Sequence, residues 1–147
     1  MTPQALSEML AQPQHAGIYH LPRGGQKMLV QAAEAQHYAC LSADLGDADN
    51  MAGALAALGR ELKFPDWYGA NLDALHDCLT DLSWCEAPGY VLMLRGGDRL
   101  HAHEPEAFTT LTEVLGSVVG AWREQQLPFW VFFDLRADGL PTLPTLA

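Results

Sequence analysis

The stretch Phe64–Leu82, FPDWYGANLDALHDCLTDL, predicts one helix with a distinct apolar side and a distinct polar side. Gly69 interrupts the preceding run, and Asn71 is a favourable N-cap residue, so we expect the helix to begin at about Leu72. Leucines at positions 72, 75, 79 and 82 recur at helical spacing and form an apolar stripe. The stretch therefore predicts an amphipathic helix that packs its leucines against a core.

A second stripe on the same helix is polar. Asp73, His76, Asp77 and Thr80 follow one another at helical spacing, displaced from the leucine stripe. Between Phe64 and Leu94 the chain carries five acidic residues and no Lys or Arg. Most acidic groups on an exposed helix face are only solvated, and the pattern alone leaves that interpretation open. The alternative is a surface that binds a basic partner from outside.

Strands and helices alternate through the rest of the chain from residue 36 onward. Apolar runs bounded by turn residues predict the strands, and apolar positions at helical spacing predict the helices. The predicted elements around Phe64–Leu82 are a strand at Tyr38–Ser42, a helix at Asp47–Lys63, a strand at Tyr90–Arg95, a helix at Pro105–Gln125 and a strand at Phe129–Leu135. Helical connections return each strand in the same direction, so this order predicts an α/β fold with a small three-stranded parallel sheet packed with helices.

The first 35 residues are expected to form an N-terminal extension of this domain. They contain a short predicted helix up to Gln12, an apolar run at Ile18–Leu21, a turn at Pro22–Gly25 and a predicted helix at Lys27–Ala35. Two prolines make a regular structure unfavourable in the last residues. We therefore divide the chain into an extension at 1–35, a domain at 36–137 and an irregular tail at 138–147.

Composition and charge favour a globular protein with a basic partner. The chain has 147 residues, of which 49% are hydrophobic and 18% charged, which fits one domain with a substantial core. Its formal net charge is −10, and residues 1–35 are neutral, so the excess belongs to the following domain. Binding of nucleic acid requires a basic surface and is therefore not expected. An acidic domain suits a basic protein instead, with electrostatic attraction that speeds association.

The cysteines and the N-terminal residues favour the cytoplasm. Cys40, Cys78 and Cys85 cannot all pair, and none forms a C-x-x-C motif with another, so free thiols in a reducing compartment are expected. The first residues show no basic start followed by an apolar run, and no segment approaches the length of a membrane span. No contact with a membrane is expected.

Enzymatic chemistry is the first alternative that the residues raise. His76 and Cys78 are close in sequence, but the two lie at different angles around a helix, so Cys78 does not face His76 as a nucleophile. Asp73 and Asp77 form a carboxylate pair of the kind used in glycoside hydrolysis, but no second motif indicates a pocket around them. We therefore expect no catalytic residue.

A metal site is the second alternative. His101, His103 and Glu104 form an H-x-H-E cluster, but the spacing is not a zinc pattern, and the cluster falls where a polar loop is expected between a strand and a helix. No metal or other cofactor is expected. Three of the four tryptophans, at positions 84, 122 and 130, are predicted to lie in the core, and Trp67 is assigned to the loop before the acidic helix.

One run of residues resembles a known family. The sequence W-Y-G-x-N-L-D-A-L-x-D-C-L-T, from Trp67 to Thr80, resembles the signature of the barstar family, small bacterial inhibitors of the ribonuclease barnase. The family fold, a three-stranded parallel sheet with helices, agrees with the elements predicted above. In this family the helix and the preceding loop plug the nuclease active site, and acidic side chains occupy the places of substrate phosphates. The resemblance implies the same role for the acidic helix here.

The resemblance also implies roles for individual residues. Asp77 is the implied central anchor, Asp73 is its neighbour, and Thr80 is a contact at the rim. Trp67 matches an aromatic contact in the loop, which Tyr68, Gly69 and Asn71 are expected to shape. His76 stands where the best-known member has a tryptophan, and it is expected at the rim. Glu124 follows Trp122 and Arg123 as in the last helix of the family, where the glutamate adds a peripheral ionic contact.

The sequence therefore predicts a non-catalytic, cytoplasmic inhibitor. Its expected partner is a basic ribonuclease of the barnase type or a related toxin, which points to an immunity role. The alternative is an interaction module that keeps the fold and the acidic helix but binds another basic protein.

Overall fold

The structure is a computed structural model, and it describes residues 2–21 and 25–134 of the chain. Helices and strands alternate through these residues, as predicted. The elements are α1 (Pro3–Leu10), the short 3-10 helix η1 (Pro13–His15), β1 (Ile18–His20), α2 (Gln26–Ala35), β2 (Ala39–Asp44), α3 (Met51–Glu61), α4 (Leu72–Thr80), the 3-10 helix η2 (Ser83–Cys85), β3 (Tyr90–Arg95), α5 (Asp98–His103), α6 (Pro105–Glu124) and β4 (Phe129–Phe133).

The strands form one parallel sheet in the order β1-β4-β3-β2. One row of the register places Ile18 opposite Val131, Val131 opposite Leu92 and Leu92 opposite Leu41. The fold is thus the predicted α/β sheet packed with helices, but it has four strands where three were predicted. The fourth strand, β1, comes from the first 35 residues. At three residues it is too short to show an alternating pattern in the sequence.

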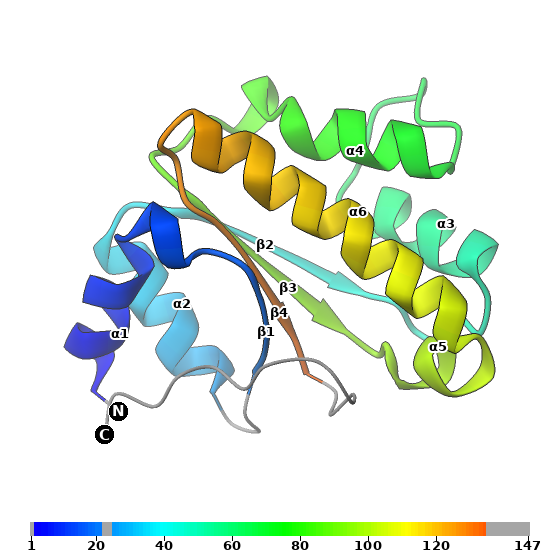
Figure 1. Cartoon of the computed structure of the whole chain (residues 1–147), viewed down its shortest axis with the longest axis horizontal. Helices are drawn as coiled ribbons and strands as arrows, with labels where there is room; N and C mark the ends of the chain where they lie inside the picture. Colours follow the sequence, from blue (N-terminus) through cyan, green and yellow to red (C-terminus); the bar gives the residue numbers. More distant parts are fainter. Residues whose placement is uncertain (1, 22–24, 135–147) are drawn as a thin grey trace.

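Helices cover both faces of the sheet (Figure 1). In this view α1 and α2 lie on one side, and α3, α4 and α6 lie on the other. The crossover directions agree with this arrangement, because the connection from β1 to β2 and the connections from β2 to β3 and β4 run across the sheet in opposite senses. The helices α4 and α6 also pack on each other, so α4 lies on the outer side of its layer.

Strand β4 is buried on both of its faces, which explains its unbroken apolar sequence. Phe129 packs against Trp122 of α6, with ring centroids 6.5 Å apart. Trp130 and Phe132 point the other way and contact Tyr19 of β1, at 5.7 and 6.1 Å between ring centroids. All five residues of the strand are 0% exposed. Residues from the N-terminal segment therefore share the core with the rest of the chain.

Polar contacts also bind the N-terminal segment to the domain. The Trp130 indole and the Tyr38 hydroxyl both donate to the carbonyl oxygen of Leu10, each at 3.0 Å. The guanidinium of Arg123 donates to the carbonyl oxygen of Ala16 at 2.5 Å. The division of the chain at residues 35 and 137 stays a prediction. The tail at 138–147 and most of the predicted turn at Pro22–Gly25 lie outside the described residues.

Several element boundaries differ from the prediction. The helix predicted at Asp47–Lys63 begins at Met51, because the Asn50 side chain accepts a hydrogen bond from the Gly53 N–H at 2.8 Å and caps the first turn. The strand predicted at Tyr38–Ser42 runs from Ala39 to Asp44 in register with β3.

The region around His101 was predicted to be a loop and is the helix α5 instead. Leu100 is fully buried, and the His101 ring meets Phe108 edge-on with 5.1 Å between centroids. One turn of helix is thus held by packing that the local sequence does not show. Among the described residues, no helix is both long and apolar enough to cross a membrane.

Candidate functional site

The acidic helix α4 begins where the sequence predicts. Asn71 has an extended backbone, and its side-chain oxygen accepts a hydrogen bond from the Ala74 N–H at 2.8 Å. This bond satisfies one of the free N–H groups of the first turn. Asp73 lies in that turn, where the positive end of the helix dipole favours a carboxylate. The cap therefore fixes both the start of α4 and the position of its first acidic residue.

The loop before α4 is anchored on α3 by Tyr68. The Tyr68 hydroxyl donates to the carbonyl oxygen of Leu55 at 2.8 Å, and its ring packs edge-on against Phe64 with 4.8 Å between centroids. The ring lies so close to Gly59 that a Cβ there would stand 2.5 Å from a ring carbon. Burial, followed by the nearby Cys78 thiol, raises the pKa of Tyr68 to about 12. Tyr68 is thus a half-buried support of the loop.

The end of the loop is tight and presents an exposed aromatic ring. A Cβ at Gly69 would lie 3.0 Å from the Asn71 side-chain nitrogen, so glycine leaves room for the cap. Ala70 has a φ of 52°, in the left-handed region that ordinary residues rarely adopt. Trp67 is 58% exposed. An exposed tryptophan on an anchored loop is a suitable contact for a partner.

The two faces of α4 have the predicted character. Leu75 and Leu79 are fully buried, whereas Asp73 and Asp77 are exposed. The two aspartates are four residues apart, about 6 Å along the helix axis. In residues 2–21 and 25–134 the one ion pair joins Arg99 to Asp49, at 3.7 Å. Within this part of the chain, the carboxylates of α4 therefore have no basic partner.

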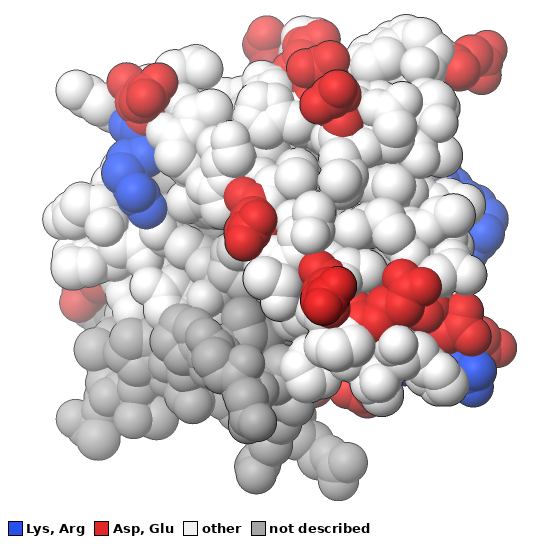
Figure 2. Space-filling model, turned by 45° about the vertical axis from the view of Figure 1, so that its right-hand side comes forward, with Lys and Arg blue, Asp and Glu red and all other residues white. Residues whose placement is uncertain are grey.

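Figure 2 shows the charge distribution on one face of the molecule. Acidic side chains are spread over this face in several groups, including one along the upper edge, the level at which α4 lies in Figure 1. The basic side chains visible in this view lie at the margins of the face. The exposed carboxylates thus form part of a surface with an excess of negative charge, consistent with the net charge of −10.

His76 and Thr80 are half-buried and bonded within the protein. The His76 Nε2 atom lies 3.2 Å from the Ser117 hydroxyl of α6. The Thr80 hydroxyl donates to the carbonyl oxygen of His76 at 2.7 Å. The predicted rim residues therefore lie beside the contact between α4 and α6, and their role toward a partner stays a prediction.

The C-terminal end of α4 is attached to α6. The buried Trp122 indole N–H donates to the carbonyl oxygen of Leu79 at 2.8 Å, in the last turn of α4. Such last-turn carbonyls have no partner within their own helix. Glu124 is exposed at the last residue of α6, two positions beyond Trp122. Both ends of α4 are thus fixed, by Asn71 at one and Trp122 at the other.

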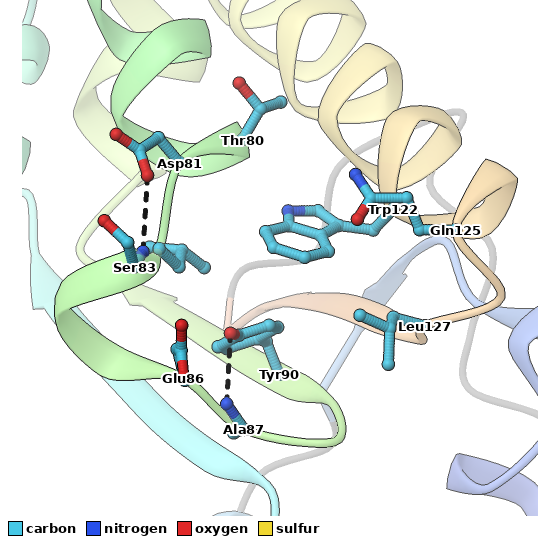
Figure 3. Close-up of a pocket in the computed structure, with 10 residues that line it drawn as sticks. Thr80, Asp81, Ser83, Glu86, Ala87, Tyr90, Trp122, Gln125 and Leu127 are labelled. Atoms are coloured by element: carbon cyan, nitrogen blue, oxygen red, sulfur yellow. Dashed lines mark hydrogen bonds between the residues drawn. The ribbon is translucent and has the colours of Figure 1, made fainter.

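A hollow of about 400 Å³ opens where α4 and α6 end and β3 begins (Figure 3). Its lining consists of Thr80, Asp81, Leu82, Ser83, Glu86, Ala87, Tyr90, Trp122, Gln125 and Leu127. Of these residues, Thr80 alone was predicted to contact a partner. The absence of Lys and Arg between Phe64 and Leu94 was visible in the sequence. That the end of α6 lies close to the end of α4 could not be predicted from it.

The prediction that Trp84 lies in the core is wrong. Trp84 is 51% exposed, in η2 immediately after α4. Trp122 and Trp130 are buried as predicted. A periodic apolar pattern predicts which side chains lie in the core, but η2 is too short to have one, so no local pattern indicates where the side chain of Trp84 lies.

Two observations bear on the alternative chemistries. The three cysteines are free thiols, and burial, followed by the charges of Asp77 and Asp81, raises the pKa of Cys78, which disfavours the nucleophilic thiolate. His101 packs on Phe108. Across residues 2–21 and 25–134, no group of three or more metal-ligating side chains lies close enough together to hold an ion.

Residues 2–21 and 25–134 form a parallel α/β domain with an acidic helix at its surface, and the carboxylates of this helix have no basic partner among these residues. A family model described as Barstar (barnase inhibitor) matches residues 38–134, well over half of the 147-residue chain. The chain belongs to this family. A search of curated proteins found no match. The matched region contains β2, β3, β4 and the whole of α4, and it leaves α1, β1 and α2 outside.

Proposed function

We propose that this protein inhibits a ribonuclease of the barnase type, or a related toxin, by covering its basic active site with α4 and the loop before it. The observation that carries the proposal is the state of Asp73 and Asp77. Both are exposed on a helix fixed at its two ends, and neither has a basic partner in the described residues. The description of the family as barnase inhibitors supports the same function.

The carboxylates have the chemistry of a phosphate substitute. A ribonuclease binds the phosphates of its substrate with Arg, Lys and His donors, and a carboxylate accepts from the same donors in short, charge-assisted hydrogen bonds. Opposite charges on the two proteins also speed their encounter. Because the cap at Asn71 and the bond from Trp122 hold α4 in place, binding does not have to order the helix.

Individual roles follow from position. Asp77, in the middle of α4, is the central anchor, and Asp73 binds beside it. Trp67 contacts the partner from the loop that Tyr68, Gly69 and Asn71 shape. The remaining members of the proposed interface are rim residues: His76, Thr80 and Glu124.

The protein is not an enzyme in this proposal, and it acts in the cytoplasm of the cell that makes the nuclease, as an immunity protein. Its negative charge disfavours nucleic acid as a direct ligand. The protein therefore blocks the nuclease by imitating RNA, and it does not itself bind RNA.

An inhibition assay with Asp77→Asn tests the proposal. Barnase is titrated with the intact protein and with the variant, and cleavage of RNA is measured. Removing one charge from a buried ion pair costs about 3–5 kcal/mol, so the inhibition constant should rise by a factor of at least about 100. Asp47→Asn is the control, because Asp47 is an exposed carboxylate in the turn before α3 and lies outside the proposed interface.

Two results would contradict the proposal. Equal inhibition by the intact protein and Asp77→Asn would show that α4 is not the inhibitory element. If the intact protein does not inhibit barnase, it is used to capture binding partners from the native cell extract. The captured proteins are then assayed for RNA cleavage. Recovery of basic proteins without nuclease activity would favour the interaction module.

A further inference from the structure

The hollow beside the end of α4 has walls of different character (Figure 3). Asp81, Ser83 and Glu86 line one side, and Gln125 and Leu127 line the other. Both carboxylates are exposed, and none of the ten lining residues is a Lys or Arg. The rim of the hollow therefore carries carboxylate oxygens, and no Lys or Arg in the lining neutralises them.

The floor of the hollow is apolar in effect, although it contains two polar aromatic residues. Trp122 and Tyr90 are 7% and 2% exposed. The Trp122 N–H is already used on the carbonyl oxygen of Leu79, and the Tyr90 hydroxyl accepts from the Ala87 N–H at 3.2 Å. The Tyr90 hydroxyl keeps its own proton, and the ring carbons of both residues belong to the apolar part of the lining. An apolar floor below an acidic rim matches a side chain with an aliphatic stem and a cationic head.

The hollow is also large enough for such a side chain. Its volume of about 400 Å³ equals that of roughly a dozen water molecules at about 30 Å³ each. At the rim, the Asp81 Oδ1 atom accepts from the Ser83 N–H at 3.3 Å. The Asp81 Oδ2 and both carboxylate oxygens of Glu86 make no hydrogen bond to the described residues. These oxygens are available to a guanidinium or ammonium group.

The hollow is continuous with the acidic face of α4. Thr80 belongs both to the polar stripe of the helix and to the lining of the hollow, and Asp81 follows Asp77 by one helical turn. The exposed Trp84 is next in sequence to Ser83, which lines the hollow. Exposed tryptophans thus flank α4 at both ends, Trp67 before it and Trp84 after it. Aromatic residues are enriched in protein interfaces, and tryptophan rings attract cationic side chains.

We infer that this hollow is a second anchor point, which receives an arginine or lysine side chain of the same basic ribonuclease while Trp84 packs beside it. The identity of the partner rests on the proposed function. The occupant follows from charge complementarity and from continuity with the surface of Asp73 and Asp77. The binding surface then extends from Trp67 past the end of α4 to Glu86.

A titration with a single capped arginine tests the hollow without any ribonuclease. N-acetyl-arginine N-methylamide is added to the ¹⁵N-labelled intact protein, and the backbone amide signals of residues 80–87 are followed by NMR. We expect saturable shifts confined to the lining residues at roughly millimolar concentration, as for a weak single-group ligand. The uncharged citrulline analogue should produce no saturable shift.

Two double variants complete the titration. Asp81→Asn with Glu86→Gln should weaken arginine binding at least about tenfold. Glu8→Gln with Glu34→Gln removes the same charge from exposed positions on α1 and α2 and should leave binding unchanged. Equal binding by the two double variants, equal binding of citrulline, or shifts spread over the whole surface would overturn the inference.

A second measurement separates this inference from the proposed function. Inhibition of barnase should weaken by about twofold to thirtyfold in Asp81→Asn with Glu86→Gln, as expected for two partly solvated ion pairs, and not in the control pair. If the intact protein neither inhibits barnase nor retains an RNA-cleaving protein from its native cell extract, the proposed function fails, while the arginine titration still decides the chemistry of the hollow. If inhibition is intact and arginine does not bind the hollow, this inference alone fails.

Discussion

Asn71 links the local sequence to the proposed binding surface. Its side chain caps α4, and the position of the cap determines which residues of the helix face outward. Asn50 performs the same task for α3, with the same bond length of 2.8 Å to the third residue beyond it. Comparing variants of the two asparagines therefore separates the effect of losing a helix cap from the effect of disturbing the proposed binding surface.

We predict that Asn71→Ala and Asn50→Ala lower the free energy of unfolding by similar amounts, about 1 kcal/mol each. Only Asn71→Ala should also weaken ribonuclease binding, because only its cap orders the first turn that carries Asp73. Urea unfolding and calorimetric binding measure the two effects. Weakening of binding by both variants to the same degree would show that general stability, not the start of α4, controls affinity.

The raised pKa of Tyr68 should make the stability of the fold depend on pH in the alkaline range. The pKa of Tyr68 in the folded protein is about 12, against 10.0 for an unperturbed phenol, so the folded state holds the proton more strongly than the unfolded state. The resulting stabilisation is complete below about pH 10 and is lost as the pH rises through about 12. The intact protein should therefore lose stability more steeply between pH 10 and 12 than Tyr68→Phe.

Urea unfolding at several alkaline pH values checks this difference. Burial also raises the pKa values of Tyr38 and Tyr90, but both residues remain in the variant, so the comparison isolates Tyr68. Parallel pH profiles for the two proteins would refute the prediction.

Single residues were predictable where their neighbours in the sequence determine their environment. The cap at Asn71 and the burial of Leu75 and Leu79 follow from spacing along one helix. The bond of His76 to Ser117 joins residues 41 positions apart, so no local pattern contains it. The exposure of Trp84 depends likewise on where η2 lies against the rest of the fold.

At the scale of elements, α6 supports α4 through Trp122. The indole N–H donates to a carbonyl oxygen at the end of α4 and thereby connects the last turn of this helix to a 20-residue helix on the sheet. Trp130 makes the same kind of bond to the carbonyl oxygen of Leu10, at 3.0 Å, but on the side of the sheet away from α4.

We predict that Trp122→Phe and Trp130→Phe both destabilise the fold, because each removes buried ring atoms. Trp122→Phe should cost a further 1–3 kcal/mol or so, because it leaves the Leu79 carbonyl without its donor. The Leu10 carbonyl keeps the bond from Tyr38. Only Trp122→Phe should weaken ribonuclease binding, as measured by calorimetry. Unchanged affinity in Trp122→Phe would show that α4 does not depend on this contact.

The long elements were predictable, and the short ones were not. Strand β3 was predicted with the bounds it has, and α6 was predicted to within one residue, because both carry strong apolar patterns. The three residues of β1 and the six of α5 carry no pattern of their own. Their structures are determined by pairing with β4 and by packing on Phe108, contacts that exist only in the folded chain.

At the scale of the whole molecule, the N-terminal segment forms a layer of the fold. It covers the face of β4 that carries Trp130 and Phe132, and it adds the strand β1 at the edge of the sheet. The family match begins at residue 38 and does not include this segment. The sequence predicted an extension at residues 1–35. The buried contacts of this segment predict that it contributes to the stability of the fold.

We predict that a chain beginning at Gln36 loses most of its stability or fails to fold. Burial of one large apolar side chain contributes about 1.5–3 kcal/mol, and the truncation uncovers at least Trp130 and Phe132, against a total stability of about 5–15 kcal/mol for a typical domain. Thermal unfolding and binding of a hydrophobic dye measure the effect. An unchanged midpoint and no dye binding would show that residues 1–35 are dispensable for the fold.

In the proposed complex, α4 occupies the place of RNA in the active site of the ribonuclease. Displacement of a substrate analogue tests it most directly: a fluorescent deoxydinucleotide phosphate bound to barnase is titrated with the intact protein, and its anisotropy is followed. We predict complete release at one equivalent of inhibitor, and release by Asp77→Asn only at concentrations at least about 100 times higher. A ternary complex, in which the analogue stays bound while the two proteins associate, would contradict the claim.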